Sequence, residues 1–175
     1  MKPIALLLVA VVAPAGMVAL DPAPVQADGE VAPIFGVKIP PGYRDWRLIS
    51  VAHEQGNLND LRAILGNDVA IAAYREGKRP FPDGTIIARL AWSYVPSEEN
   101  NKVFGRPQSF VAGPATDWYL QFMVKDSKKY AATDGWGFAQ FNKDHNPANE
   151  AIHKTCFPCH EAIKARDFVF TRYAP

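Results

Sequence analysis

The strongest strand signal in the chain is FPDGTIIARLAWSY, residues 81–94. Its first four residues place a Pro and a Gly where a turn needs them, and the following residues alternate with a period of two. This pattern predicts a strand from Thr85 to Tyr94. One face of that strand would carry Ile86, Ala88, Leu90 and Trp92, and the other Thr85, Ile87, Arg89 and Ala91.

Shorter patterns on both sides of this stretch predict the rest of the fold. Further strands are expected at residues 46–51, 61–65, 118–124 and 135–141. A cap at residues 66–68 and helical spacing predict a helix that runs to Gly77. We also expect a long irregular excursion over residues 95–117, a short helix over 125–130, a helical turn over 149–154 and an extended piece over 168–173.

The order of these elements predicts the fold class. Strands outnumber helices, and short connections between consecutive strands favour antiparallel pairing. We therefore expect an α+β domain with a mostly antiparallel sheet and flanking helices on one side. Its charges are balanced, with 19 Lys and Arg against 18 Asp and Glu. No basic stripe or acidic tail occurs, so we expect no nucleic-acid partner.

The residues Cys156-Phe157-Pro158-Cys159-His160 predict the chemistry, because C-x-x-C-H is a haem-attachment signature. Two thiols at this spacing can form thioethers with the two vinyl groups of one haem, and His160 can then bind the iron through an imidazole nitrogen. The motif predicts one haem c, covalently held through Cys156 and Cys159, with His160 as the iron ligand.

Two other uses of this motif stay open in the sequence. A zinc site needs four ligands, and His145 and His153 could complete one with the two cysteines, but this spacing fits no common zinc module. A thioredoxin-like redox pair, or a plain disulfide, also uses C-x-x-C. Such a redox motif follows an early strand, whereas only fifteen residues follow His160 here.

The N-terminus predicts export. Lys2 precedes an apolar stretch at residues 4–13, and Val25-Gln26-Ala27 offers a cleavage site for a signal peptidase. An uncleaved anchor over residues 3–20 is the alternative, although a Pro and a Gly interrupt it. We expect a periplasmic protein with a signal peptide over residues 1–27, a loose leader over 28–41 and a haem c domain over 42–175.

Six stretches in order give the chain a family resemblance. They are Gly42-Tyr43-Arg44-Asp45-Trp46, Phe81-Pro82-Asp83-Gly84-Thr85, residues 124–130 (VKDSKKY), residues 135–138 (GWGF), the C-x-x-C-H motif, and residues 167–173 (DFVFTRY). Through them the chain resembles the cytochrome P-460 family, which includes the cytochromes c′-beta. The resemblance implies a beta-rich fold, usually a homodimer, with one haem c. It also implies that His160 is proximal and that the opposite iron face is open to a small nitrogen-oxide ligand.

One departure from the family pattern concerns Arg89. Hydroxylamine-oxidising members carry a lysine bonded covalently to the haem, four residues beyond the Asp-Gly-Thr turn, and Arg89 stands at that position. A guanidinium is cationic and a poor nucleophile, so the crosslink should be absent. Arg89 could be an exposed strand residue, or a pocket residue that contacts a bound ligand or a propionate. In a pocket it would need a carboxylate or propionate partner.

Other distal residues are suggested by the same resemblance. Catalytic members share a pocket carboxylate, and the position that we align with it holds Gln121, which cannot act as a base. Glu150 is the closest carboxylate upstream of the motif and stays a candidate. Phe138 and Trp136 are candidates for contact with the haem. His53, Met123, His145 and His153 could bind the opposite iron face, but each has an ordinary explanation as a core or surface residue.

Together these features predict an exported mono-haem c protein. It would bind nitric oxide or a similar small ligand at an open iron, without the lysine crosslink. One alternative is a haem oxidoreductase that acts on hydroxylamine or another small nitrogen compound. Another is an electron-transfer cytochrome that meets a redox partner protein. Whether the protein is an enzyme stays open in the sequence.

Overall fold

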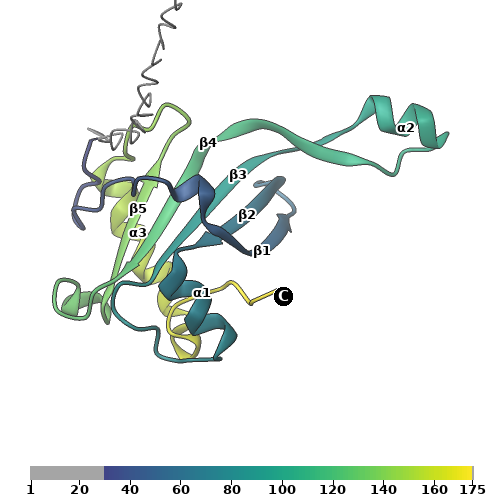
Figure 1. The fold of residues 1–175 in the computed structure, drawn as a ribbon. Helices are drawn as coiled ribbons and strands as arrows, with labels where there is room; N and C mark the ends of the chain where they lie inside the picture. The colour runs from purple at the N-terminus through teal and green to yellow at the C-terminus, as the bar shows by residue number, and fades with distance from the viewer. Residues whose placement is uncertain (1–29, 175) are drawn as a thin grey trace, which may run out of the picture.

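The computed structural model describes residues 30–174, and one antiparallel sheet forms the centre of this part of the chain (Figure 1). The predicted α+β fold is confirmed. Each strand pairs with its neighbours in the sequence, which gives the spatial order β1-β2-β3-β4-β5. The strands are β1 Arg47–Glu54, β2 Asp60–Gly66, β3 Ile86–Pro96, β4 Phe110–Lys125 and β5 Trp136–Phe141.

Helices α1 (Asp68–Arg75) and α3 (Glu150–Glu161) lie on one side of the sheet. α1 packs at the β1–β2 end, where a side chain at Gly66 would meet Ala70 of the helix. α3 packs on β5 at the opposite edge. Each helix begins at an asparagine that accepts a backbone N–H at 3.0 Å, Asn67 for α1 and Asn149 for α3. The segment after α3 lies between the two helices.

Residues 32–39 pack on the sheet, so the loose leader expected over residues 28–41 is wrong for this stretch. Most of its apolar side chains are buried in the same core as the sheet, whereas Ile34 is exposed. Tyr43, just beyond it, meets Phe122 of β4 edge to face, and Phe35 meets Phe138 of β5 in the same way, both with 5.5 Å between ring centroids. The buried residues of the stretch are Ala32, Phe35, Val37 and Ile39. The signal peptide expected over residues 1–27 lies outside the described residues.

β3 and β4 continue past the other strands as a two-stranded arm that ends in α2, Glu98–Phe104 (Figure 1). On the arm the pairing runs from Tyr94 with Ala112 to Pro96 with Phe110. The irregular excursion predicted for residues 95–117 is therefore wrong. On the arm no core covers either face, so the sequence lacks the alternation by which a half-buried strand is recognised.

Three further predictions differ in detail. Instead of the short helix predicted for residues 125–130, Lys125 ends β4 and residues 126–130 form a turn before the 3-10 helix Ala131–Thr133, because the Asp126 carboxylate accepts the N–H groups of Lys128 and Lys129. The helical turn predicted at 149–154 is the first half of α3, which continues through the C-x-x-C-H motif. The piece at 168–173 joins no strand within the described residues. None of the helices in residues 30–174 has the length and apolar character needed to cross a membrane.

Candidate functional site

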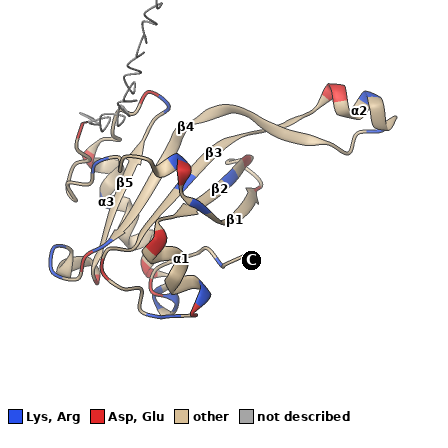
Figure 2. Ribbon diagram, in the orientation of Figure 1, with Lys and Arg blue, Asp and Glu red and all other residues tan. Residues whose placement is uncertain are grey.

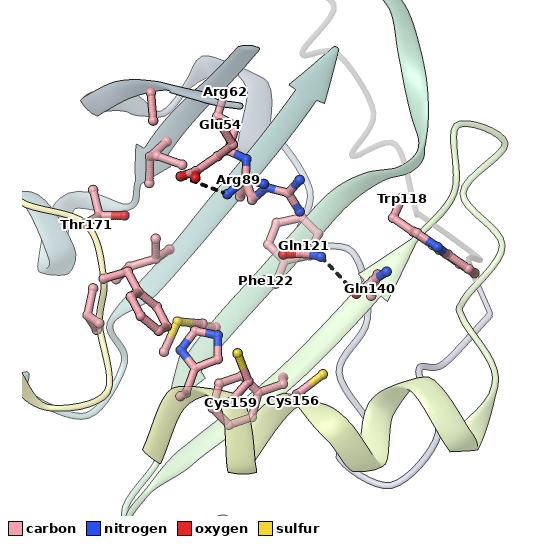
Figure 3. A pocket seen from close by; sticks show the side chains of 18 of the residues that line it. Glu54, Arg62, Arg89, Trp118, Gln121, Phe122, Gln140, Cys156, Cys159 and Thr171 are labelled. Atoms are coloured by element: carbon pink, nitrogen blue, oxygen red, sulfur yellow. Dashed lines mark hydrogen bonds and ion pairs between the residues drawn. The ribbon is translucent and has the colours of Figure 1, made fainter. Parts of the chain in front are cut away.

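A cavity of about 680 Å³ lies between one face of the sheet, α3 and the segment that follows α3 (Figure 3). Strand register places its sheet residues in rows. The first row holds Ser50, Ile64, Arg89, Gln121 and Gln140, one from each strand, and the next holds Ile87, Met123 and Phe138. The predicted mixed face of β3, with Ile87 and Arg89, is the face that lines this cavity.

The motif residues line the cavity from α3. Positions three and four apart share a helix face, so Cys156, Cys159 and His160 are presented together. Both cysteines are free, which is contrary to a disulfide. Burial raises the pKa of the Cys156 thiol to about 11. A redox cysteine instead has a lowered pKa, as at a helix N-terminus, whereas Cys156 lies in the middle of α3.

The imidazole ring of His160 is in the tautomer that can bind a metal ion. Its Nδ1 lies 2.7 Å from the carbonyl oxygen of Phe168, so the ring N–H donates to that oxygen and Nε2 keeps its lone pair. Burial lowers the pKa of His160, which favours the neutral ring. The ring centroid of Phe138 lies 4.9 Å from that of His160 and forms part of the adjoining wall.

Arg89 lies in the cavity and has a carboxylate partner. Its Nη2 donates to Oδ2 of Asp60 at 3.1 Å, and Arg62 donates to the same carboxylate from Nε at 2.7 Å. Burial, and then the nearby Arg62, lower the pKa of Arg89 to about 10, so it stays cationic at neutral pH. Its Nε is buried and has no hydrogen-bond partner within the described residues.

Asp60 and Gln140 belong to the site but were not predicted from the sequence. The carboxylate of Asp60 is 3% exposed and joins two arginines. The only signal for it is its position directly before the predicted strand 61–65, two residues from Arg62 on the same face. Gln140 accepts a hydrogen bond at 2.8 Å from Gln121 Nε2 (Figure 3). Alternation with Phe138 along β5 could have placed it in the cavity.

Two predicted site residues lie elsewhere. Trp136 shares the strand face of Phe138 but lies beyond the end of the cavity, fully buried against Phe81. Glu150 is exposed in the first turn of α3 and pairs with Lys154 at 2.7 Å. The structure therefore brings together Arg89, Gln121, Phe138, Cys156, Cys159 and His160, and it leaves Trp136 and Glu150 outside.

Of the four candidates for the opposite iron face, only Met123 lines the cavity. His153 is fully buried, with Nδ1 3.0 Å from Asn149 O and Nε2 3.2 Å from Gln140 N, so both ring nitrogens are engaged. His145 is exposed in a turn, and His53 stacks on a tyrosine outside the cavity. Within residues 30–174 no three His, Cys, Asp or Glu side chains come together as a metal site, which opposes the zinc alternative.

The residues present fit a haem. A neutral imidazole, two unbonded thiols on the same helix face and an aromatic wall meet in one cavity, and the orphaned Nε of Arg89 offers a donor to an anionic or polar group. The fold and the site together define a haem-binding α+β protein. The family model of cytochrome P460 matches residues 40–171, and the chain belongs to this family. It is accordingly a haem protein. A comparison with curated proteins found no match.

Proposed function

We propose that the protein is an exported mono-haem c protein that binds nitric oxide or a similar small ligand, without a lysine crosslink. Cys156 and Cys159 would tether the haem, and His160 would bind its iron. Each thioether forms when an S–H group adds across a vinyl double bond: the sulfur bonds to one carbon and the hydrogen goes to the other, so no oxidant is needed. A haem bound here supplies an iron that can bind small diatomic molecules.

The observation that carries the proposal is the place of Arg89. It occupies the strand position of the crosslinking lysine, and no lysine lines the cavity within the described residues. A guanidinium held by Asp60 does not add to a porphyrin carbon. Its unpaired Nε can instead donate to a bound ligand or to a propionate.

The neighbouring side chains favour binding over proton removal. Gln121 and Gln140 extend the row from Arg89 across β4 and β5, and their amides are linked at 2.8 Å. An amide can orient a ligand through a hydrogen bond, but it cannot act as a general base. The row therefore offers donors and acceptors without a carboxylate.

One carboxylate supports a second candidate function, the oxidation of hydroxylamine or a related small nitrogen compound. Glu54 lines the cavity rim, where its carboxylate lies 3.3 Å from Nη1 of Arg62 (Figure 3). A carboxylate at this place could accept protons from a bound substrate. The same reaction would require an external electron acceptor, such as a redox partner protein.

Absorption spectra and peptide masses test the main proposal. We expect the reduced protein to show an ordinary high-spin spectrum that changes when nitric oxide is added, and the haem peptide to carry two thioether bonds. A red-shifted Soret band, or a third bond between protein and haem, would contradict the role assigned to Arg89. The variant Cys156→Ser/Cys159→Ser should lose covalent haem, and Arg89→Met should keep it but release nitric oxide faster.

A turnover assay separates the second candidate from the first. We expect no hydroxylamine turnover with a soluble electron acceptor. If turnover occurs and Glu54→Gln abolishes it, while nitric oxide binding is unchanged, the oxidoreductase is the better description. Glu161→Gln, a change in an exposed residue at the end of α3, is the matched control.

We also propose that the protein forms a homodimer through the arm. Its two strands are free of charged residues between the body and α2 (Figure 2), and they expose Phe110 and Val111. At the tip, Val103 is 79% exposed. An exposed apolar, uncharged surface of this kind is typical of an interface. Light scattering should give twice the monomer mass, and Phe110→Asp/Val111→Asp should give the monomer. An unchanged mass for the variant would contradict the arm as the interface.

A further inference from the structure

A buried carboxylate outside the cavity organises the turn after α3. The side chain of Asp167 is 9% exposed. Its Oδ2 accepts the backbone N–H of Phe81 at 2.7 Å, and its Oδ1 accepts hydrogen bonds from Nζ of Lys125 at 2.9 Å and Nε1 of Trp136 at 3.2 Å. Three donors from three separate parts of the chain therefore hold one carboxylate.

The backbone at this turn has an unusual conformation. Asp167 and Phe168 have φ of 53° and 64°, both in the left-handed region. Side-chain-bearing residues avoid this region, and two in succession persist only when surrounding contacts impose them. The bonds to Phe81, Lys125 and Trp136 are such contacts. They fix the conformation at the residue before Phe168.

The carbonyl of Phe168 is the group that orients the predicted iron ligand. It accepts the Nδ1–H of His160 at 2.7 Å. A hydrogen bond of this kind sets the tautomer and the direction of an imidazole, and it raises the basicity of the other ring nitrogen, which faces the metal. Asp167 itself does not line the cavity, so it would act on a bound haem indirectly, through the residues that follow it.

We propose that Asp167 is a positioning residue for the proximal histidine. Its carboxylate, held by Lys125 and Trp136, maintains the left-handed turn that keeps the Phe168 carbonyl on Nδ1 of His160. This inference rests on the proposed function, in which His160 binds the haem iron. It also gives Trp136 a role in the site, through its hydrogen bond to Asp167 and not through contact with the cofactor.

Resonance Raman spectra of the reduced holoprotein test the proposal through the iron–histidine stretching band. In Asp167→Asn the turn loses its charged anchor, so the bond to Nδ1 weakens and the imidazole becomes less basic. We expect the band to move to lower frequency and the reduction potential to rise. Trp136→Phe removes one of the three donors and should give a smaller shift in the same direction.

Asp83→Asn is the control, because Asp83 also holds a turn through its carboxylate, which accepts the N–H and the hydroxyl of Ser127 at 2.8 and 2.6 Å, but it lies outside the cavity and has no link to His160. It should lower stability and leave the band in place. If Asp167→Asn lowers stability in the same way and leaves both band and potential unchanged, the inference is wrong. If Asp167→Asn does not fold, the iron–histidine band measured in Trp136→Phe and Lys125→Met tests the inference in its place. A wild-type protein without the band would instead contradict the assignment of His160, and this inference would fall with it.

Discussion

Asp60 of β2 and Arg89 of β3 form an ion pair across neighbouring strands, with 3.1 Å between Oδ2 and Nη2. Asp60 also binds Arg62, so one buried carboxylate compensates two guanidinium groups at the cavity wall. Without it, Arg89 would lose its carboxylate partner in a buried position, and Arg62 would keep only its pair with Glu54 at the cavity rim.

We therefore predict that Asp60→Asn strongly destabilises the protein. Removal of one partner from a buried ion pair leaves an uncompensated charge, and the expected loss is about 3 kcal/mol in the free energy of unfolding. Urea unfolding of the holoprotein measures it. Asp144→Asn breaks the exposed pair with Lys143 and should change stability by less than about 1 kcal/mol. Equal losses of unfolding free energy in the two variants would show that the buried ion pairs of Asp60 contribute no more to stability than an exposed pair.

Gln121 and Glu150 should differ in their effect on ligand binding. Gln121 lines the cavity beside Arg89, whereas Glu150 is exposed and bound to Lys154. We predict that Gln121→Leu changes the dissociation rate of nitric oxide by a few-fold or more, since one hydrogen bond contributes about 1 kcal/mol. Glu150→Gln should leave that rate unchanged. Stopped-flow spectroscopy measures both rates, and an effect of Glu150→Gln alone would contradict the site described above.

Tyr74 should make stability sensitive to high pH. It is buried, its hydroxyl lies 3.2 Å from the carbonyl oxygen of Thr171, and burial raises its pKa to about 12. Below pH 10 the phenol is protonated in both the folded and the unfolded protein. Between about pH 10 and 12 the unfolded chain loses this proton first, so stability falls by about 2 to 3 kcal/mol.

The variant Tyr74→Phe tests this pH dependence. At pH 9 it should be less stable than wild type by about 1 kcal/mol, because a hydrogen bond is lost. As the pH rises toward 12 the difference should shrink and then reverse, because phenylalanine does not ionise. Urea unfolding at a series of pH values measures both proteins. A constant difference across the series would show that Tyr74 does not titrate as expected.

Gly137 should not tolerate a side chain. A Cβ at this position would overlap the ring of Tyr130, which is buried against β5. We predict that Gly137→Ala costs about 1 to 3 kcal/mol in the free energy of unfolding, as is typical of overpacking. In a Tyr130→Leu background the same change should cost less, because the overlapping ring is gone. Additive losses in the double variant would contradict this explanation.

Local patterns in the sequence predicted the fold where a buried face imposed a period. The alternation along β3 placed Ile87 and Arg89 on one strand face, which is the face that lines the cavity, and Asn67 in the predicted cap marks the start of α1. The same reasoning failed on the arm, where neither strand face is covered. It failed at residues 125–130 because Asp126 competes for backbone N–H groups.

The site was predictable only in part, because its residues come from strands whose register the sequence does not reveal. The C-x-x-C-H motif is local, so the sequence grouped the three residues that α3 brings to the cavity. Asp60 became visible only when β2 was paired with β3. Trp136 was expected near the haem as part of an aromatic lining, and it shares a strand face with Phe138, but the cavity ends between them. Alternation predicts the strand face on which a residue lies, but it does not predict how far along the strand the cavity extends.

The consecutive strand order has a consequence for biogenesis. A meander in which every strand pairs with its sequence neighbour has short closure loops, so it can form progressively as the polypeptide emerges. The sheet wall of the cavity is complete by Phe141, ahead of the helix that bears both thiols. In vectorial folding the sheet wall would therefore form first, and α3 and the segment that follows it would close the cavity afterwards.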